Sequence, residues 1–110
     1  MDTSFNLGYA LSAVRIFKAG NNELANEFMY KSLFYSTRNL ICFKTGELIV
    51  GYNNIYQKSK EIEIPDKYRE LLELAYKLRN EEIKDISSKF YFKNISYINK
   101  FIILILEENL

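Results

Sequence analysis

Few residue types in this sequence could carry chemistry, and the most informative one is missing. The chain of 110 residues contains no histidine and one cysteine, Cys42. The lack of histidine removes the usual general base, the usual zinc ligand and every Ser-His or Cys-His nucleophile pair. One cysteine cannot form an intramolecular disulfide or a thiolate cluster, and we expect Cys42 to be a small buried hydrophobe.

The remaining chemical side chains are poorly placed for a metal or a cofactor, so we expect neither. Glu81 and Glu82 are adjacent, and neighbours on a helix diverge by about 100°, which makes them a poor metal pair. The four glycines are scattered, so no phosphate-binding glycine loop is present. The nine tyrosines are more typical of core or interface aromatics than of a base-stacking platform.

Length and composition indicate one domain, residues 1–110, with a real hydrophobic core. A hydrophobic content of 48% and a formal charge of +1 argue against disorder and against a strongly basic nucleic-acid surface. Asp2 stands where a secretory signal would be basic, and the longest apolar run, residues 101–106, is far shorter than the ~20 residues that span a bilayer. We therefore expect a cytoplasmic protein without a membrane contact.

The chain is organised around a predicted helix from Gly20 to Phe43. Asn21 or Asn22 can cap its start, and Lys44 followed by Gly46 marks its end. Its apolar positions cover most of the circumference: Ala25, Phe28, Met29, Ser32, Ser36, Leu40 and Phe43 form one face, and Tyr30, Leu33, Phe34, Thr37 and Ile41 form a second. A narrow polar strip remains: Glu27, Lys31, Tyr35 and Arg38. Such a helix should be contacted from more than one side.

The flanking segments supply the helices that could cover it. A first helix is predicted from Thr3 or Ser4 to about Lys18, with its main apolar face at Leu7, Ala10, Leu11, Val14 and Phe17. A short helix or irregular turn follows Gly46, and residues 61–64 form an extended connector because Pro65 disfavours helical dihedrals before it. Pro65 and Asp66 open another helix, whose spacing can extend to Ile83 and Ile86. A last helix begins at Asn94 or Ser96. These elements predict an all-α, up-and-down bundle of four to five helices.

The central segment also resembles a known family. A pattern of small, aromatic and basic residues runs through it: Ala25, Tyr30, Ser32, Phe34, Ser36, Arg38 and Leu40. Together with the preceding turn at residues 17–20, this pattern resembles the first helical hairpin of HEPN domains. The resemblance implies a HEPN-like bundle from a family that includes partners of nucleotidyltransferases and RNase toxins.

The resemblance extends to Arg79 and Asn80, which match the opening of the catalytic HEPN motif. In that motif an Arg, often followed by a polar residue, precedes a His; the Arg binds the scissile phosphate and the His moves a proton. Here the His position falls at Lys84, Asp85 or Ile86. The resemblance therefore implies the scaffold and puts its RNase activity in doubt, since lysine titrates near ~10.4.

The ligand-binding candidates are thus Arg79, Asn80, Lys84 and Arg38, and each has a structural alternative. Arg79 could pair with Glu82 one turn on. Lys84 could be a solvated charge. Arg38 could reach the same cleft or extend to solvent.

Three classes of function remain open. The first is a non-catalytic HEPN-like partner that binds a nucleotidyltransferase, an RNA or a nucleotide, in a toxin–antitoxin type of system. The second is an endoribonuclease toxin that uses Arg79 and Asn80, with Tyr or Lys in place of His. The third is a structural helical interaction module.

Apolar surface on the central and last helices also predicts a homodimer. The last helix is apolar nearly all round, which favours a second chain against it. Its candidate contact residues are Phe101, Ile102 and Ile105. HEPN domains commonly pair through helices that flank the motif, which would bring Arg79 and Asn80 of both chains toward one shared cleft.

Overall fold

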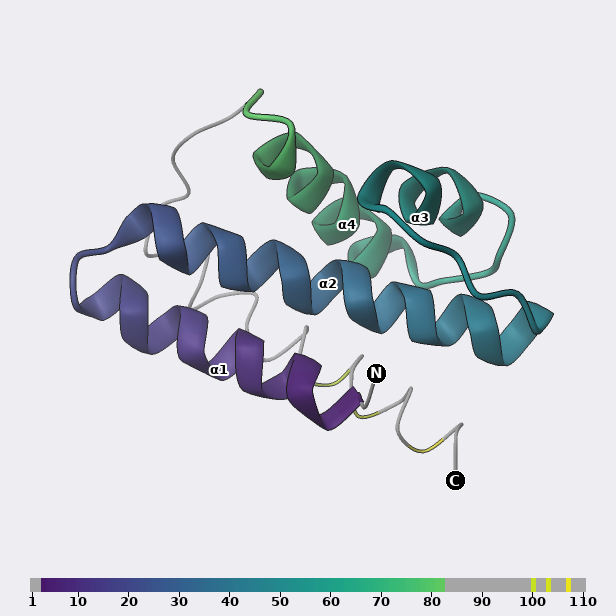
Figure 1. Ribbon diagram of the computed structural model, residues 1–110, viewed down its shortest axis with the longest axis horizontal. Coiled ribbons are helices and arrows are strands. Elements are labelled where there is room, and N and C mark those ends of the chain that lie inside the picture. The colour runs from purple at the N-terminus through teal and green to yellow at the C-terminus, as the bar shows by residue number, and fades with distance from the viewer. Residues whose placement is uncertain (1–2, 83–99, 101–102, 104–106, 108–110) are drawn as a thin grey trace.

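The computed structural model describes residues 3–82 together with residues 100, 103 and 107. This part of the chain contains four helices and no strand (Figure 1). The helices are α1 (Thr3–Lys18), α2 (Asn22–Thr45), α3 (Tyr52–Ser59) and α4 (Asp66–Arg79). The predicted all-α fold is therefore confirmed for the described residues. None of the described helices is long and apolar enough to cross a membrane.

The α1–α2 hairpin is closed by a tight turn that the sequence predicts. Gly20 has φ 92°, a left-handed conformation that is available to glycine without a Cβ clash. Its N–H donates to the Phe17 carbonyl at 3.0 Å, and the Asn21 N–H donates to the Ile16 carbonyl at 3.3 Å. The Asn21 side chain then accepts from the Leu24 N–H at 3.2 Å and caps α2. One helix ends and the next begins within a few residues.

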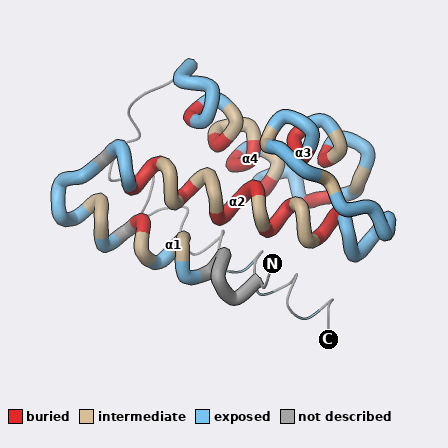
Figure 2. The backbone as a smooth tube through the Cα atoms, in the orientation of Figure 1, coloured by how far each residue is buried: buried red, intermediate tan, exposed pale blue. Residues whose placement is uncertain are grey.

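Helix α2 is the centre of the molecule, as predicted. It contacts α1 on one side and both α3 and α4 on another (Figure 1). Figure 2 shows buried positions along most of its length. Its buried residues are Ala25, Asn26, Met29, Ser32, Leu33, Phe34, Ser36, Thr37, Leu40 and Ile41. The predicted polar strip keeps partial exposure, and Lys31 Nζ lies 3.0 Å from Glu27 Oε1.

A buried hydroxyl network joins α2 to α4. Tyr68 is fully buried, and its hydroxyl donates to the Leu33 carbonyl at 3.0 Å. The Thr37 hydroxyl lies 3.1 Å from the Tyr68 hydroxyl and donates to the same carbonyl at 2.7 Å. These bonds satisfy polar groups that would otherwise be costly to bury, and they fix the position of α4 along α2.

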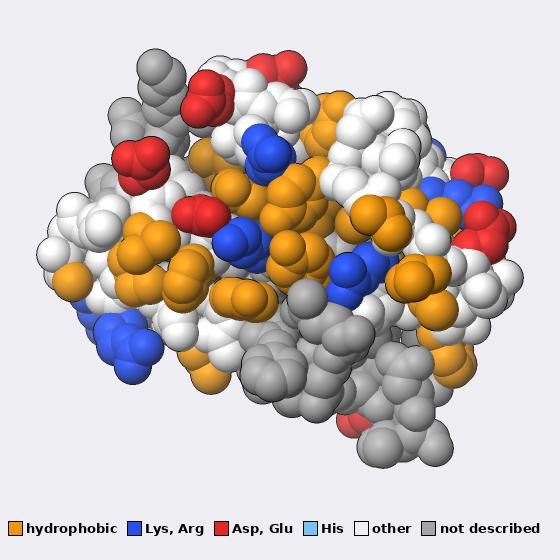
Figure 3. Space-filling view, viewed as in Figure 1, with side chains coloured by type: hydrophobic (Ala, Val, Ile, Leu, Met, Phe, Trp, Pro, Cys, Tyr) orange, Lys and Arg blue, Asp and Glu red, His pale blue; other side chains and the backbone are white. Residues whose placement is uncertain are grey.

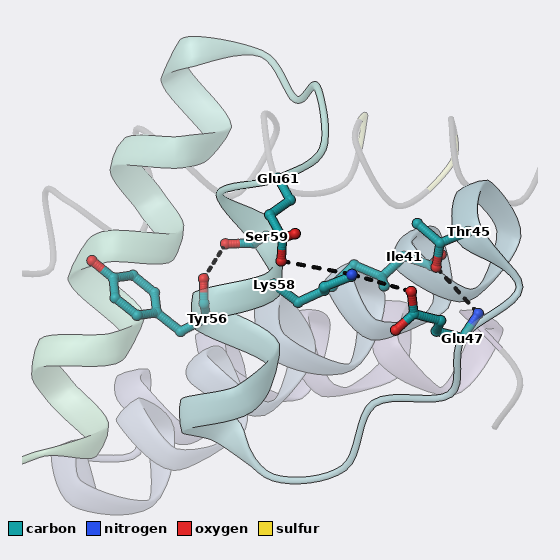
Figure 4. Close-up of polar contacts among 7 residues, drawn as sticks. All are labelled: Ile41, Thr45, Glu47, Tyr56, Lys58, Ser59 and Glu61. Carbon is teal, nitrogen blue, oxygen red and sulfur yellow. Dashed lines mark hydrogen bonds and ion pairs between the residues drawn. The ribbon is translucent and has the colours of Figure 1, made fainter.

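Side chains from both flanking segments hold α3 in place. Lys58 on α3 lies 3.1 Å from Glu47, just beyond the end of α2, and 3.6 Å from Glu61 in the next turn (Figure 4). The Arg69 guanidinium, on α4, donates to the Ser59 and Ile62 carbonyls at 3.3 and 3.1 Å. The short helix is thereby fixed against both of its neighbours.

The predicted burial of Leu11, Cys42 and Phe43 is wrong. Leu11 is 54% exposed, whereas Ala13, two residues later on the same helix, is fully buried. Cys42 and Phe43 are exposed, because α2 has 24 residues against 16 in α1, and its last turns extend beyond α1 (Figure 1). The sequence leaves the end of α4 open, and the structure ends this helix at Arg79.

The predicted last helix lies almost entirely outside the described residues. This holds for Lys84 and for the proposed contact residues Phe101, Ile102 and Ile105. In the same span, Lys100, Ile103 and Glu107 are helical and exposed.

Candidate binding site

Arg79 is the last residue of α4, and its exposed side chain lies on an aromatic ring. Its Cζ atom is 5.1 Å from the centroid of the Tyr52 ring, which is the geometry of a cation–π contact. The alternative ion pair with Glu82 does not form, since no carboxylate among the described residues pairs with Arg79. The side chain is therefore held by a ring, and its charge has no described partner.

Arg38 occupies a matching position on α2. Its Cζ atom lies 5.1 Å from the centroid of the Tyr35 ring, one turn earlier on the same helix. The side chain is half-buried, and within the described part of the chain its Nε has no hydrogen-bond partner. Arg38 therefore packs along the protein surface, with its guanidinium on a ring, and does not extend freely to solvent.

The two tyrosines under these arginines contact each other. The Tyr35 and Tyr52 rings are stacked, with centroids 6.0 Å apart and an interplanar angle of 29°. Their hydroxyl oxygens are 3.2 Å apart and share a hydrogen bond. Arg38, Tyr35, Tyr52 and Arg79 therefore form one continuous group, which we call the arginine–tyrosine cluster. It joins two of the predicted candidates, from helices far apart in the sequence.

Further aromatic side chains pack against the tyrosine rings of this cluster. The Tyr52 ring lies 4.9 Å from Phe34 and 5.6 Å from Tyr30, centroid to centroid. Tyr9 on α1 packs 6.2 Å from the Tyr35 ring. On one face of the molecule, hydrophobic side chains gather where α2, α3 and α4 meet, and Lys and Arg side chains border them (Figure 3). The resulting surface is aromatic at its centre and is bordered by Lys and Arg side chains.

Burial raises the pKa of two tyrosines in this region, Tyr30 and Tyr52. Burial, followed by the hydrogen bond with Tyr35, raises the pKa of Tyr52, although Arg79 opposes the shift. Burial and then the Glu27 carboxylate raise the pKa of Tyr30. The charges of the site at neutral pH are therefore the two guanidinium groups, while the nearby Lys31 is paired with Glu27.

The other candidates do not join the cluster. Asn80 follows the end of α4, where its backbone N–H donates to the Tyr76 carbonyl at 3.0 Å. No hydrogen bond joins its exposed side chain to another described residue, so its visible role is to end the helix. Lys84 lies outside the described residues. The described residues also contain no group of three or more His, Cys, Asp or Glu side chains that could hold a metal ion.

Sequence reasoning missed the two tyrosines as site residues. For Tyr35 a signal exists, because Tyr35 and Arg38 are three apart on a predicted helix and such pairs meet on its surface. For Tyr52 no local signal exists. Its contacts with Tyr35 and Arg79 are set by the packing of α3 against α2 and α4, which sequence spacing does not encode.

No family model matches this chain, and comparison with curated proteins and with solved structures found no match.

Proposed function

We propose that this protein is a non-catalytic, HEPN-like helical protein that binds a phosphate-bearing ligand, a nucleotide or an RNA strand. The observation that carries the proposal is the arginine–tyrosine cluster, in which Arg38 and Arg79 lie on one pair of stacked tyrosines. A nucleotidyltransferase partner and a toxin–antitoxin type of system belong to the same proposal through the resemblance to HEPN domains.

The chemistry of the cluster suits phosphate. A guanidinium that lies on an aromatic ring keeps its N–H donors at the edge, where they match the oxygens of a phosphate in a bidentate way. Stacking also reduces the freedom that each side chain loses when a ligand binds. Neither arginine has a carboxylate partner among the described residues, so neither must break an ion pair first.

The same site is poorly suited to cleavage of RNA. The chain has no histidine, and the raised pKa values of Tyr30 and Tyr52 leave their hydroxyls protonated at neutral pH. The Asn80 side chain makes no described contact with the cluster. These points favour a binding protein over the alternative of an endoribonuclease that uses Arg79 and Asn80.

The proposal is tested by measuring the affinity for a short 5′-phosphorylated oligoribonucleotide and for AMP. Arg38→Ala and Arg79→Ala should each weaken binding by about 5- to 20-fold, because each removes charge-assisted hydrogen bonds. Arg15→Ala is the matched control, since Arg15 is exposed on α1 and lies outside the cluster. The RNA should remain intact.

Comparison of the two ligands identifies the source of the phosphate. Tighter binding of the oligoribonucleotide indicates a strand, and equal binding indicates a single nucleotide. If all three alanine variants bind the ligands with the affinity of the wild-type protein, the proposed site is wrong.

A further inference from the structure

Tyr52 is linked to both arginines of the cluster, to one directly and to the other through Tyr35. Its ring carries the Arg79 guanidinium at 5.1 Å, and its hydroxyl shares the hydrogen bond with Tyr35, whose ring carries Arg38. Arg38 and Tyr35 belong to α2 and Arg79 belongs to α4, whereas Tyr52 is the first residue of α3. Helix α3 thus connects the two cationic ends of the cluster.

The position of Tyr52 is well determined by its surroundings. Phe34 and Tyr30 pack against its ring, and the ring is half-buried. Gly51, directly before it, has φ 93°, a conformation that lets the chain turn into α3. At the other end of α3, Lys58 is held by Glu47 and Glu61. A ring fixed in this way can determine where a flexible arginine side chain lies.

We infer that Tyr52 is the positioning residue shared by both guanidinium groups. It holds Arg79 directly through its ring and Arg38 indirectly through the hydroxyl contact with Tyr35. The two arginines therefore act as a pair within a single chain, and ligand binding does not require the arginines of a second subunit. The consequence for affinity rests on the proposed function, whereas the positioning itself does not.

The positioning is tested by NMR of the arginine side chains in the full chain without ligand. Ring current from Tyr52 should shift the Arg79 Cδ protons upfield, and Tyr52→Leu should remove that shift. Tyr52→Phe keeps the ring and loses the hydroxyl, so it should leave the Arg79 signals in place and move those of Arg38. Unchanged Arg79 signals in Tyr52→Leu would overturn the inference.

Tyr56→Leu is the matched control. Tyr56 lies on the same helix and stacks on Tyr76 with centroids 3.8 Å apart, but it contacts neither arginine of the cluster. This variant should lower thermal stability and leave the Arg38 and Arg79 signals unchanged. If it moves them as much as Tyr52→Leu does, the effect is a general loosening of α3 and the specific role of Tyr52 is wrong.

Ligand affinity provides the second readout. Tyr52→Leu should weaken oligoribonucleotide binding about as much as Arg79→Ala, and the double variant should lose little more, because both remove the same contact. If Tyr52→Leu binds with the affinity of the wild-type protein, Tyr52 has no role in ligand binding, and its role in positioning is still decided by the NMR signals. An unchanged protein that binds neither ligand refutes the proposed function, while the NMR signals still decide the positioning.

Discussion

Tyr68 shows how a single polar atom can fix two helices in a small core. Its ring is fully buried between α2 and α4, and its hydroxyl contacts the Leu33 carbonyl and the Thr37 hydroxyl. Burial raises the pKa of Tyr68, so the hydroxyl keeps its proton for donation. These contacts join the first turn of α4 to the middle of α2.

We expect Tyr68→Phe to lower the free energy of unfolding by about 1 kcal/mol, the usual net value of a buried hydrogen bond. Tyr76→Phe is the matched control, because the Tyr76 hydroxyl donates to Asn53 Oδ1 at 2.7 Å in an exposed setting. Its cost should be clearly smaller. Denaturant titration measures both, and equal costs would contradict a special role for the buried hydroxyl.

Arg79 shows at the same scale what a sequence can and cannot reveal. Its resemblance to the opening of the HEPN motif marks it as a candidate, and helical spacing offers Glu82 as a partner. The structure gives it Tyr52 instead, 27 positions earlier in the sequence. The residue type indicates that an arginine side chain will contact a carboxylate or an aromatic ring, but tertiary packing determines which of these lies within reach.

At the scale of elements, local signals predict those helix ends that have a capping residue. Asn21 begins α2 and Gly46, with φ 76°, follows its end, both as the sequence indicates. The end of α4 is different. Glu81 adopts φ 60°, and its N–H donates to the Leu78 carbonyl at 3.2 Å while the Glu82 N–H donates to that of Lys77 at 3.0 Å.

This is the same arrangement that Gly20 makes after α1, but without a glycine. The sequence therefore carries no stop signal there, and its apolar spacing allows a longer helix. A side chain in the left-handed region costs about 1–2 kcal/mol, and the surrounding structure must offset that cost.

Substitution of Glu81 tests this helix end. Glu81→Val should destabilise the protein by about 1–2 kcal/mol, because a β-branched residue tolerates positive φ least. Glu81→Gly should be neutral or stabilising by up to about 1 kcal/mol, since relief of the clash competes with the greater freedom of the unfolded chain. Thermal unfolding of both variants measures the difference. A valine variant as stable as the glycine variant would refute the left-handed conformation.

At the scale of the whole molecule, the burial of α2 by the other helices removes one of the two arguments for a dimer. The sequence predicts apolar surface that one small bundle does not cover. In the structure, most apolar side chains of α2 are buried within one chain, and the exceptions lie near its two ends: Leu24 at 36% exposure, Cys42, and Phe43 at 51% exposure. The proposal of a homodimer now depends on the segment with Phe101, Ile102 and Ile105, where Ile103 is 45% exposed.

A dimer mass in light scattering is the expected result for the unchanged protein. Ile102→Glu or Ile105→Glu should weaken the dimer. Burying an unpaired carboxylate in an apolar interface costs on the order of several kcal/mol of association free energy. Lys100→Glu is the control, as Lys100 is exposed. A monomer at micromolar concentration would discard the homodimer and leave the arginine–tyrosine cluster, which lies within one chain, unaffected.

The central claim is that Arg38 and Arg79 together bind a phosphate-bearing ligand without cleaving it. The most direct measurement is an NMR titration of the full chain with the 5′-phosphorylated oligoribonucleotide, followed through the Nε–Hε signals of the arginines. We predict that the Arg38 and Arg79 signals move along one binding curve, that Arg15 does not move, and that the RNA stays intact. Binding that leaves both signals in place, or cleavage of the RNA that Arg79→Ala abolishes, would contradict it.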